Sequence, residues 1–126
     1  MSKLRFDLKA QKFRSELNAM SIRIGDKAVA HVKNDVFPSE SFDGRSWEKA
    51  KKPQAHKLLD KTGTMKNSIH VIRANSKGVK WGAGVPYAKY QNDGTKTITS
   101  RQFIGMDHWT RKMISEEVKT TFKRIF

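Results

Sequence analysis

Apolar residues in the first third of the chain recur every three or four positions. Between residues 7 and 36 they are Phe13, Leu17, Met20, Ile24, Ala28 and Val32. This spacing places them on one face of a helix, so we predict a long amphipathic helix over residues 7–36. Gly25 in its middle predicts a bend or break. Pro38 predicts its end, because the residue before a proline is pushed out of the α conformation. The apolar face indicates core packing or, alternatively, a groove for a partner.

Residues 37–57 follow neither the helical nor the strand period. We predict an extended loop that is anchored by Phe42 and Trp47. Irregular loops of more than about 12–15 residues are uncommon in compact domains and are usually functional or disordered. Two interpretations stay open: a contact loop that reaches a neighbouring subunit or DNA, and a solvated connector. Its cluster of cations comprises Lys49, Lys51, Lys52 and Lys57.

Residues 58–106 predict a turn followed by an antiparallel β-meander of about three to four strands. Gly63 permits a tight reversal, and Thr64 is placed to cap a short helical turn that ends at Asn67. Alternating residues over 69–74 and 79–83 then predict two strands, joined by a hairpin turn at 75–78. A helical turn that Pro86 opens and a further strand over 102–106 complete the expected order.

The last element, over residues 107–126, is predicted to be a helix capped by Asp107. Its expected apolar stripe comprises Ile114, Val118, Phe122 and Ile125, widened by Trp109 and Met113. We expect this helix to pack on the sheet. The predicted fold is therefore a single α+β domain over residues 1–126, built of two packed layers.

Composition adds a strong positive charge to this picture. The chain of 126 residues has a net charge of +14, spread over all segments, and contains no Cys. The charge predicts attraction to polyanions such as DNA, RNA or an acidic protein surface. No apolar run approaches the roughly 20 residues that span a bilayer, so no membrane partner is expected. Without Cys there are no disulfides and no thiolate metal ligands.

The sequence carries no recognisable catalytic motif. The glycines of residues 82–84 lie inside a strand pattern and lack the Lys of a phosphate-binding loop. The four histidines are not paired at helical spacing, so we predict no metal site and no cofactor. Ser100, Asp107 and His108 are neighbours in sequence without a nucleophile motif around Ser100. We therefore predict that the protein is not an enzyme.

Four segments in order carry a resemblance to a known family: FDGRSW at 42–47, LLDKTGTMKNSI at 58–69, GAGVPYAKYQNDG at 82–94 and RQFIG at 101–105. Together they resemble the phage virion morphogenesis family, the tail completion or neck proteins of tailed bacteriophages. The resemblance covers about residues 37–107. Residues Met65 and Asp93 depart from its commoner pattern, and no proline precedes Arg101.

The resemblance implies a structural protein at the head–tail neck or tail end of a virion, assembled in the host cytoplasm. It implies a homo-oligomeric ring, expected to be a hexamer, that joins the tail to the head. The expected partners are further copies of the chain, neighbouring neck, connector or tail-tube proteins, and virion DNA through non-specific contacts. The basic charge is compatible with these partners.

For residues in the four segments that carry the resemblance, we state structural roles as hypotheses. Gly63 and Gly94 would form turns, Trp47 and Tyr87 would anchor loops on the sheet, and Arg101 would pair with a carboxylate of its own or an adjacent chain. Fold maintenance is the alternative for each of them. The remaining signature residues are Leu59, Ala88 and Phe103.

The candidates for partner or DNA contacts are Lys49, Lys51, Lys52, Lys57 and Arg101. A solubilising charge run is the alternative for the four lysines. Two other function classes compete with a ring component. A small basic nucleic-acid-binding module would concentrate its charge on one face, and a nuclease would need an acid, base and metal constellation.

Overall fold

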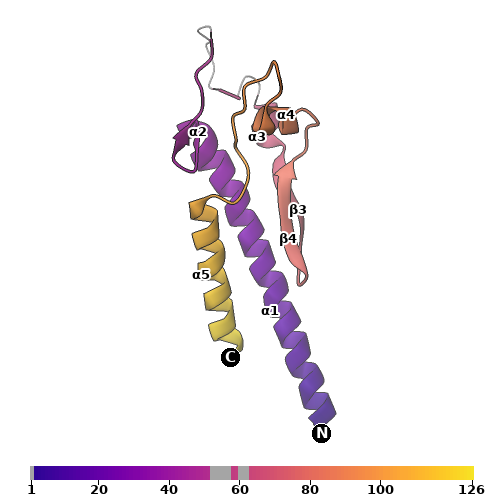
Figure 1. Ribbon diagram of the computed structural model, residues 1–126. Helices are drawn as coiled ribbons and strands as arrows, with labels where there is room; N and C mark the ends of the chain where they lie inside the picture. Colours follow the sequence, from indigo (N-terminus) through magenta and orange to yellow (C-terminus); the bar gives the residue numbers. More distant parts are fainter. Residues whose placement is uncertain (1, 52–57, 60–62) are drawn as a thin grey trace.

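The computed structural model of the chain describes residues 2–51, 58–59 and 63–126. It is an elongated α+β structure in which a long N-terminal helix runs along a β-hairpin and a C-terminal helix (Figure 1). This confirms the predicted fold class. The elements in chain order are α1 (Ser2–His31), η1 (Val32–Val36), α2 (Phe37–Ser39), β1 (Ser41–Phe42), β2 (Arg45–Ser46), α3 (Thr64–Asn67), β3 (Ile69–Asn75), β4 (Gly78–Ala83), α4 (Ala88–Asp93) and α5 (His108–Ile125).

The N-terminal helix continues past Pro38, so the predicted end before this residue is wrong. A π-helical turn, η1, follows α1, and the N–H of Phe37 donates to the carbonyl of Val32. Pro38 then stands at the start of α2, where a missing N–H is least costly. The helix ends at Glu40, whose φ of 53° is left-handed.

The predicted break at Gly25 is also absent, because α1 is continuous through this position. Ile24, Ala28 and Val32 are buried on one face, as the apolar spacing predicts. At Gly25 the hairpin of β3 and β4 approaches so closely that a Cβ there would lie 2.9 Å from Cγ2 of Val71. The glycine therefore serves close packing and does not bend the helix.

Strands β3 and β4 form the hairpin that the alternation predicted. They pair antiparallel, with Ile69 opposite Ala83 and Asn75 opposite Gly78. In the turn, the N–H of Lys77 donates to Oδ1 of Asn75 at 2.9 Å. A second hairpin, β1 and β2, lies inside the segment that was predicted to be a loop.

The described residues contain two sheets of two strands each instead of one meander. The prediction of a strand at 102–106 is wrong, because side chains from other segments form hydrogen bonds with the backbone of these residues. Oδ1 of Asn92 accepts from the N–H groups of Phe103 and Ile104, at 3.0 and 3.3 Å. Nε1 of Trp47 donates to the carbonyl of Gln102 at 2.7 Å. These side-chain bonds replace the ladder of a sheet.

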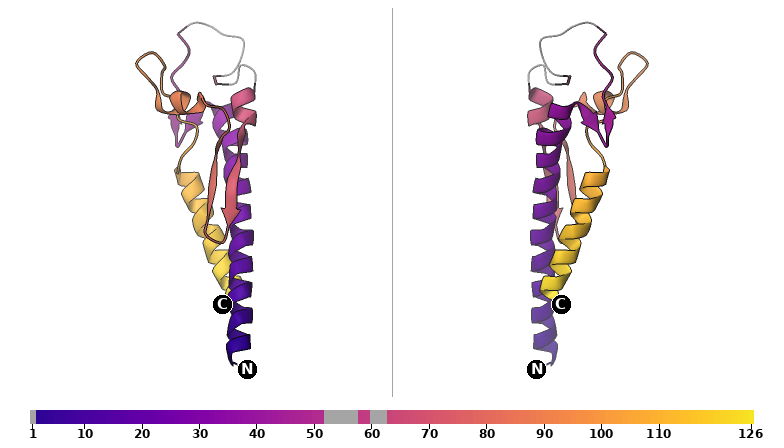
Figure 2. Two further views of the ribbon diagram at one scale, coloured as in Figure 1. Left: turned by 90° about the vertical axis from the view of Figure 1, so that its right-hand side faces the viewer. Right: turned by 90° about the vertical axis from the view of Figure 1, so that its left-hand side faces the viewer.

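Helix α5 begins as predicted, since Oδ1 of Asp107 accepts from the N–H of Thr110 at 2.9 Å. It packs mainly against α1 (Figure 2), and its contact with the hairpin is limited to the surroundings of Met113. The predicted apolar stripe is confirmed only in part: Met113 is buried and Ile114, Val118 and Ile125 are half-buried, whereas Trp109 and Phe122 are 42% and 39% exposed. The buried residues of α5 are Thr110, Met113, Glu117 and Thr121.

The main core lies at the end of the molecule that holds α2, α3 and α4, which we call the upper end (Figure 1). Its buried members are Val32, Val36, Phe37, Phe42, Trp47, Met65, Ile69, Ala88 and Phe103. A smaller cluster of Ile24, Ala28 and Met113 lies between α1, α5 and the hairpin. The opposite end, which we call the lower end, holds the N-terminal part of α1 and the C-terminus.

Candidate interaction surface

Residues from all four signature segments come together in the upper end. The ring of Trp47 meets that of Phe37 edge to face, with centroids 5.6 Å apart, and Phe103 packs on Phe37 at 5.5 Å. All three rings are buried, as expected if Trp47 anchors its loop. The small hairpin that leads to Trp47 turns at Asp43 and Gly44, whose φ angles of 53° and 80° suit a two-residue turn.

The remaining signature residues differ in their surroundings. Ala88 is buried and Leu59 is half-buried against the same core. Gly63, with φ 74°, precedes α3 in place of the expected Thr64 cap. Gly94, with φ 80°, ends α4 as a turn residue. Tyr87 is 45% exposed, which does not fit the expected role of a loop anchor.

Arg101 ties two loops of its own chain together. Its Nε donates to the carbonyl of Glu48 at 2.8 Å, and its N–H donates to the carbonyl of Gln91 at 2.9 Å. These bonds hold the segment after α4 against the segment after β2. Among the described residues Arg101 forms no ion pair, and the expected pair with a carboxylate of an adjacent chain stays a prediction.

The cationic loop is only partly described. Lys49 and Lys51 are exposed. Lys52 and Lys57 lie outside the described residues. Exposure of the first two is compatible with both interpretations of the lysine cluster, partner contact and solubility.

The contact between α1 and α5 is polar at its centre. Glu117 accepts from Nε of Arg23 at 2.9 Å and forms an ion pair with Nζ of Lys27. Nη2 of Arg23 also donates to the hydroxyl of Thr121 at 3.0 Å. The hydrogen bond from Lys27 lowers the pKa of Glu117, burial opposes this, and Arg23 adds to the lowering. Glu117 is therefore held as a carboxylate.

A second polar cluster joins α1 to the first turn of α5. Nε2 of His31 lies 2.7 Å from Oδ2 of Asp107, and its Nδ1 lies 2.8 Å from Asp35. The ring of His31 stacks on Trp109 with centroids 4.1 Å apart. Burial raises the pKa of Asp107, but the bonds from Thr110 and His31 outweigh it and the net pKa is lowered. This cluster fixes the helix orientation at the N-terminus of α5.

Sequence reasoning missed both polar clusters and the small hairpin. The Asp43-Gly44 pair is typical of a two-residue hairpin turn, so the small hairpin could have been predicted from the sequence. Arg23 and Lys27 lie four residues apart and so share a helix face, but their partner Glu117 is about 90 residues away. No local pattern predicts such a pair.

The structure does not bring Ser100, His108 and Asp107 together. The hydroxyl of Ser100 donates to the carbonyl of Asn92 at 2.8 Å, and the side chain of Asp107 is occupied by Thr110 and His31. Among the described residues, no group of three or more His, Cys, Asp or Glu side chains is placed to hold a metal ion.

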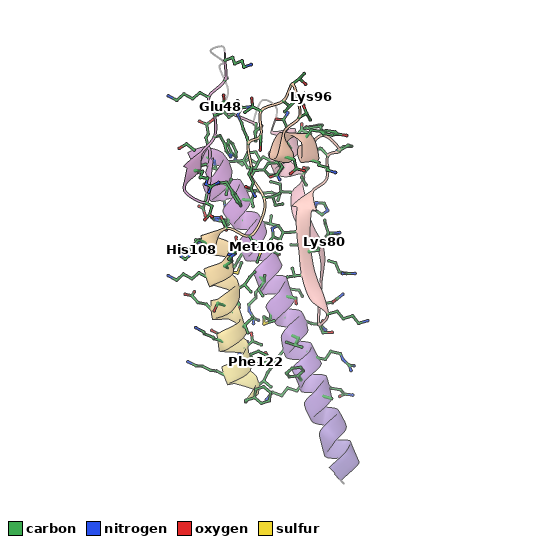
Figure 3. The ribbon with its side chains drawn as sticks, in the orientation of Figure 1. Glu48, Lys80, Lys96, Met106, His108 and Phe122 are labelled. Atoms are coloured by element: carbon green, nitrogen blue, oxygen red, sulfur yellow. The ribbon has the colours of Figure 1, made fainter. Side chains whose placement is uncertain are left out.

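Large apolar side chains are exposed at both ends. Phe13, Phe122 and Phe126 form an aromatic cluster at the lower end, with ring centroids 6.0–6.4 Å apart. Phe126 is 88% exposed. At the upper end, Tyr87, which precedes α4, and Tyr90, within α4, are exposed. Figure 3 shows Phe122 at the foot of α5, far from α4.

Comparisons with known proteins give no relative: no family model, no curated protein and no solved structure matches the chain. Within the residues that the structure describes, none of the helices has the length and apolarity to cross a membrane.

Proposed function

We propose that this protein is a structural component of a bacteriophage virion, at the head–tail neck or the tail end. It assembles into a ring, expected to be a hexamer, and joins the tail to the head. Its partners are further copies of itself, neighbouring neck, connector or tail-tube proteins, and virion DNA through non-specific contacts. Its role is mechanical and not catalytic.

The observation that carries this proposal is the convergence of the four signature segments. Although they are separated in sequence, each contributes to the upper end, where Trp47, Ile69, Ala88 and Phe103 are buried in one core. Segments that resemble one family and also form one structural unit support the resemblance more strongly than scattered matches would.

A ring also needs two different contact surfaces on each copy, because head-to-tail contacts join unlike patches. The aromatic cluster at the lower end and the exposed tyrosines at the upper end are two such apolar surfaces. Aromatic residues are enriched at the centres of protein interfaces. These surfaces are therefore candidates for contacts between copies.

The second candidate function is a small basic module that binds nucleic acid. One observation favours it: the solvent-facing side of α5 carries several exposed cations, namely Arg111, Lys112, Lys119 and Lys123. A helix with such a row can track the phosphate backbone without reading bases. Exposed Glu116 lies among them and weakens the field.

Light scattering at low and high salt, with and without duplex DNA, separates the two functions. For the ring we expect a closed oligomer whose mass persists in high salt, because apolar contacts are not screened. Rings in electron micrographs of the same sample would give the copy number. A monomer that binds DNA tightly and loses it steeply with rising salt would contradict the ring and support the nucleic-acid module.

A further inference from the structure

Strand β4 has an open outer edge. The N–H of Gly84 donates to the carbonyl of Ser68 at 3.0 Å, so this pair occupies a hydrogen-bonded position of the ladder. Positions alternate along an antiparallel pair, and Trp81 and Ala83 therefore direct their N–H and C=O groups away from β3. Within the described part of the chain, no hydrogen bond uses these outward groups.

A groove of about 580 Å³ runs along this edge. One wall is β4 itself, and the other comes from α4 and the segment before α5. Its apolar lining includes Val79, Val85, Phe103 and Met106, and Met106 is 48% exposed. An extended peptide paired with β4 would place alternate side chains against this lining.

Two cations line the groove. Lys80 and Lys89 line it together with one acid, Asp93. Arg73 and Lys77 of the same hairpin and Lys96 beyond α4 are also exposed. Figure 3 shows Lys80 on the hairpin and Lys96 at the upper end, on either side of α4. The residues of a bound strand that face away from the groove would therefore lie in a positive field, which favours carboxylates.

We infer that the outer edge of β4 and this groove bind an extended acidic segment of another protein, which adds a third strand to the hairpin. Backbone bonds to Trp81 and Ala83 would supply affinity, and the apolar lining and the cations would select alternating apolar and acidic residues. A two-stranded sheet has little stability by itself, and a third strand would strengthen it. No proline blocks the edge between Gly78 and Ala83. The inference does not depend on a ring.

The test uses the full chain and a blocked synthetic peptide of eight residues in which glutamate and valine alternate. The matched control peptide has lysine in place of glutamate. We expect the acidic peptide to bind at least about tenfold more tightly, and its addition to shift the amide resonances of Trp81 and Ala83. The double variant Lys80→Glu with Lys89→Glu should reverse the preference, because both side chains are exposed and lie at the rim.

Backbone pairing is tested separately by N-methylation of the peptide. Methyl groups on one alternate set of amides should reduce affinity about tenfold or more, whereas methyl groups on the other set should change it little, since only one set faces β4. Equal effects of both sets, equal binding of the two peptides, or no binding at all would overturn the inference. A protein that is oligomeric alone and becomes monomeric with the peptide would also overturn it, because a second copy would then occupy the groove.

Discussion

At the scale of the residue, Gly25 is where the hairpin lies closest to α1. An alanine Cβ there would be 2.9 and 3.1 Å from the two methyl carbons of Val71 and 3.2 Å from Cγ2 of Val79. In an open helix, Gly→Ala gains up to about 1 kcal/mol. Here the stiff, β-branched neighbours cannot move away easily, so we expect Gly25→Ala to lower the free energy of unfolding by about 1–3 kcal/mol, measured in urea.

The control for this substitution is the double variant Gly25→Ala with Val71→Ala, compared with Val71→Ala alone. When the valine methyl groups are removed, the added Cβ should fill space, and Gly25→Ala should become neutral or stabilising. The same loss of stability in both backgrounds would show that the crowding at Val71 is not the cause.

At the scale of the element, the start of α5 depends on Asp107. Asp107→Ala removes the acceptor for the N–H of Thr110, a cap that is worth about 0.5–2 kcal/mol. Asp107→Asn keeps an oxygen in that place but removes the carboxylate beside His31. We expect thermal unfolding to show a clearly lower midpoint for Asp107→Ala than for Asp107→Asn. An equal loss in both variants would mean that the contact with His31, and not the cap, holds the helix.

Elements with a local cause were predictable from the sequence. The periodic apolar residues, which include Ile24, Ala28 and Val32, predicted the helix and its buried face. The turn residues at 75–78 predicted the hairpin. The helix end at Pro38 was predicted wrongly because a π-helical turn changes the bond register just before it. The false strand at 102–106 has a non-local cause, since Asn92 and Trp47 take its backbone groups.

The candidate site was predictable to a smaller extent. Burial of Trp47, Ala88 and Phe103 agrees with fold-bearing roles, which the sequence pattern suggested. The edge of β4 and its groove were beyond sequence reasoning, because they depend on how α4 and the segment before α5 fold back beside the hairpin. The sequence predicted a meander of three or four strands, in which a further strand would cover the edge of β4, whereas the sheet has two strands and leaves this edge open.

At the scale of the whole molecule, the packing of α5 on α1 depends on charged side chains. Met113 is the one fully apolar side chain among the four buried residues of α5, and Glu117 and Thr121 face Arg23 and Lys27 of α1. A carboxylate buried between cations stabilises the folded state only while it is ionised. The attachment of α5 to α1 should therefore weaken in acid.

The sign of this effect follows from the lowered pKa values of Glu117 and Asp107, whose ordinary values are 4.5 and 3.8. The stability that they contribute is complete above these ordinary values, and it is lost as the pH falls through the lower folded-state values. We expect the free energy of unfolding of the natural chain, measured in urea, to fall steadily below about pH 4.5.

Glu117→Gln should remove the ionisable partner of Arg23 and Lys27. At pH 7 we expect it to cost about 1.5–3 kcal/mol, the usual contribution of hydrogen bonds to charged groups. Towards acid, the variant and the natural chain should converge, because the natural side chain is then protonated too. The exposed neighbour Glu116 provides the matched control, since Glu116→Gln should leave both stability and its pH dependence nearly unchanged. Parallel curves for the natural chain and Glu117→Gln would show that the ion pairs do not hold α5 in place.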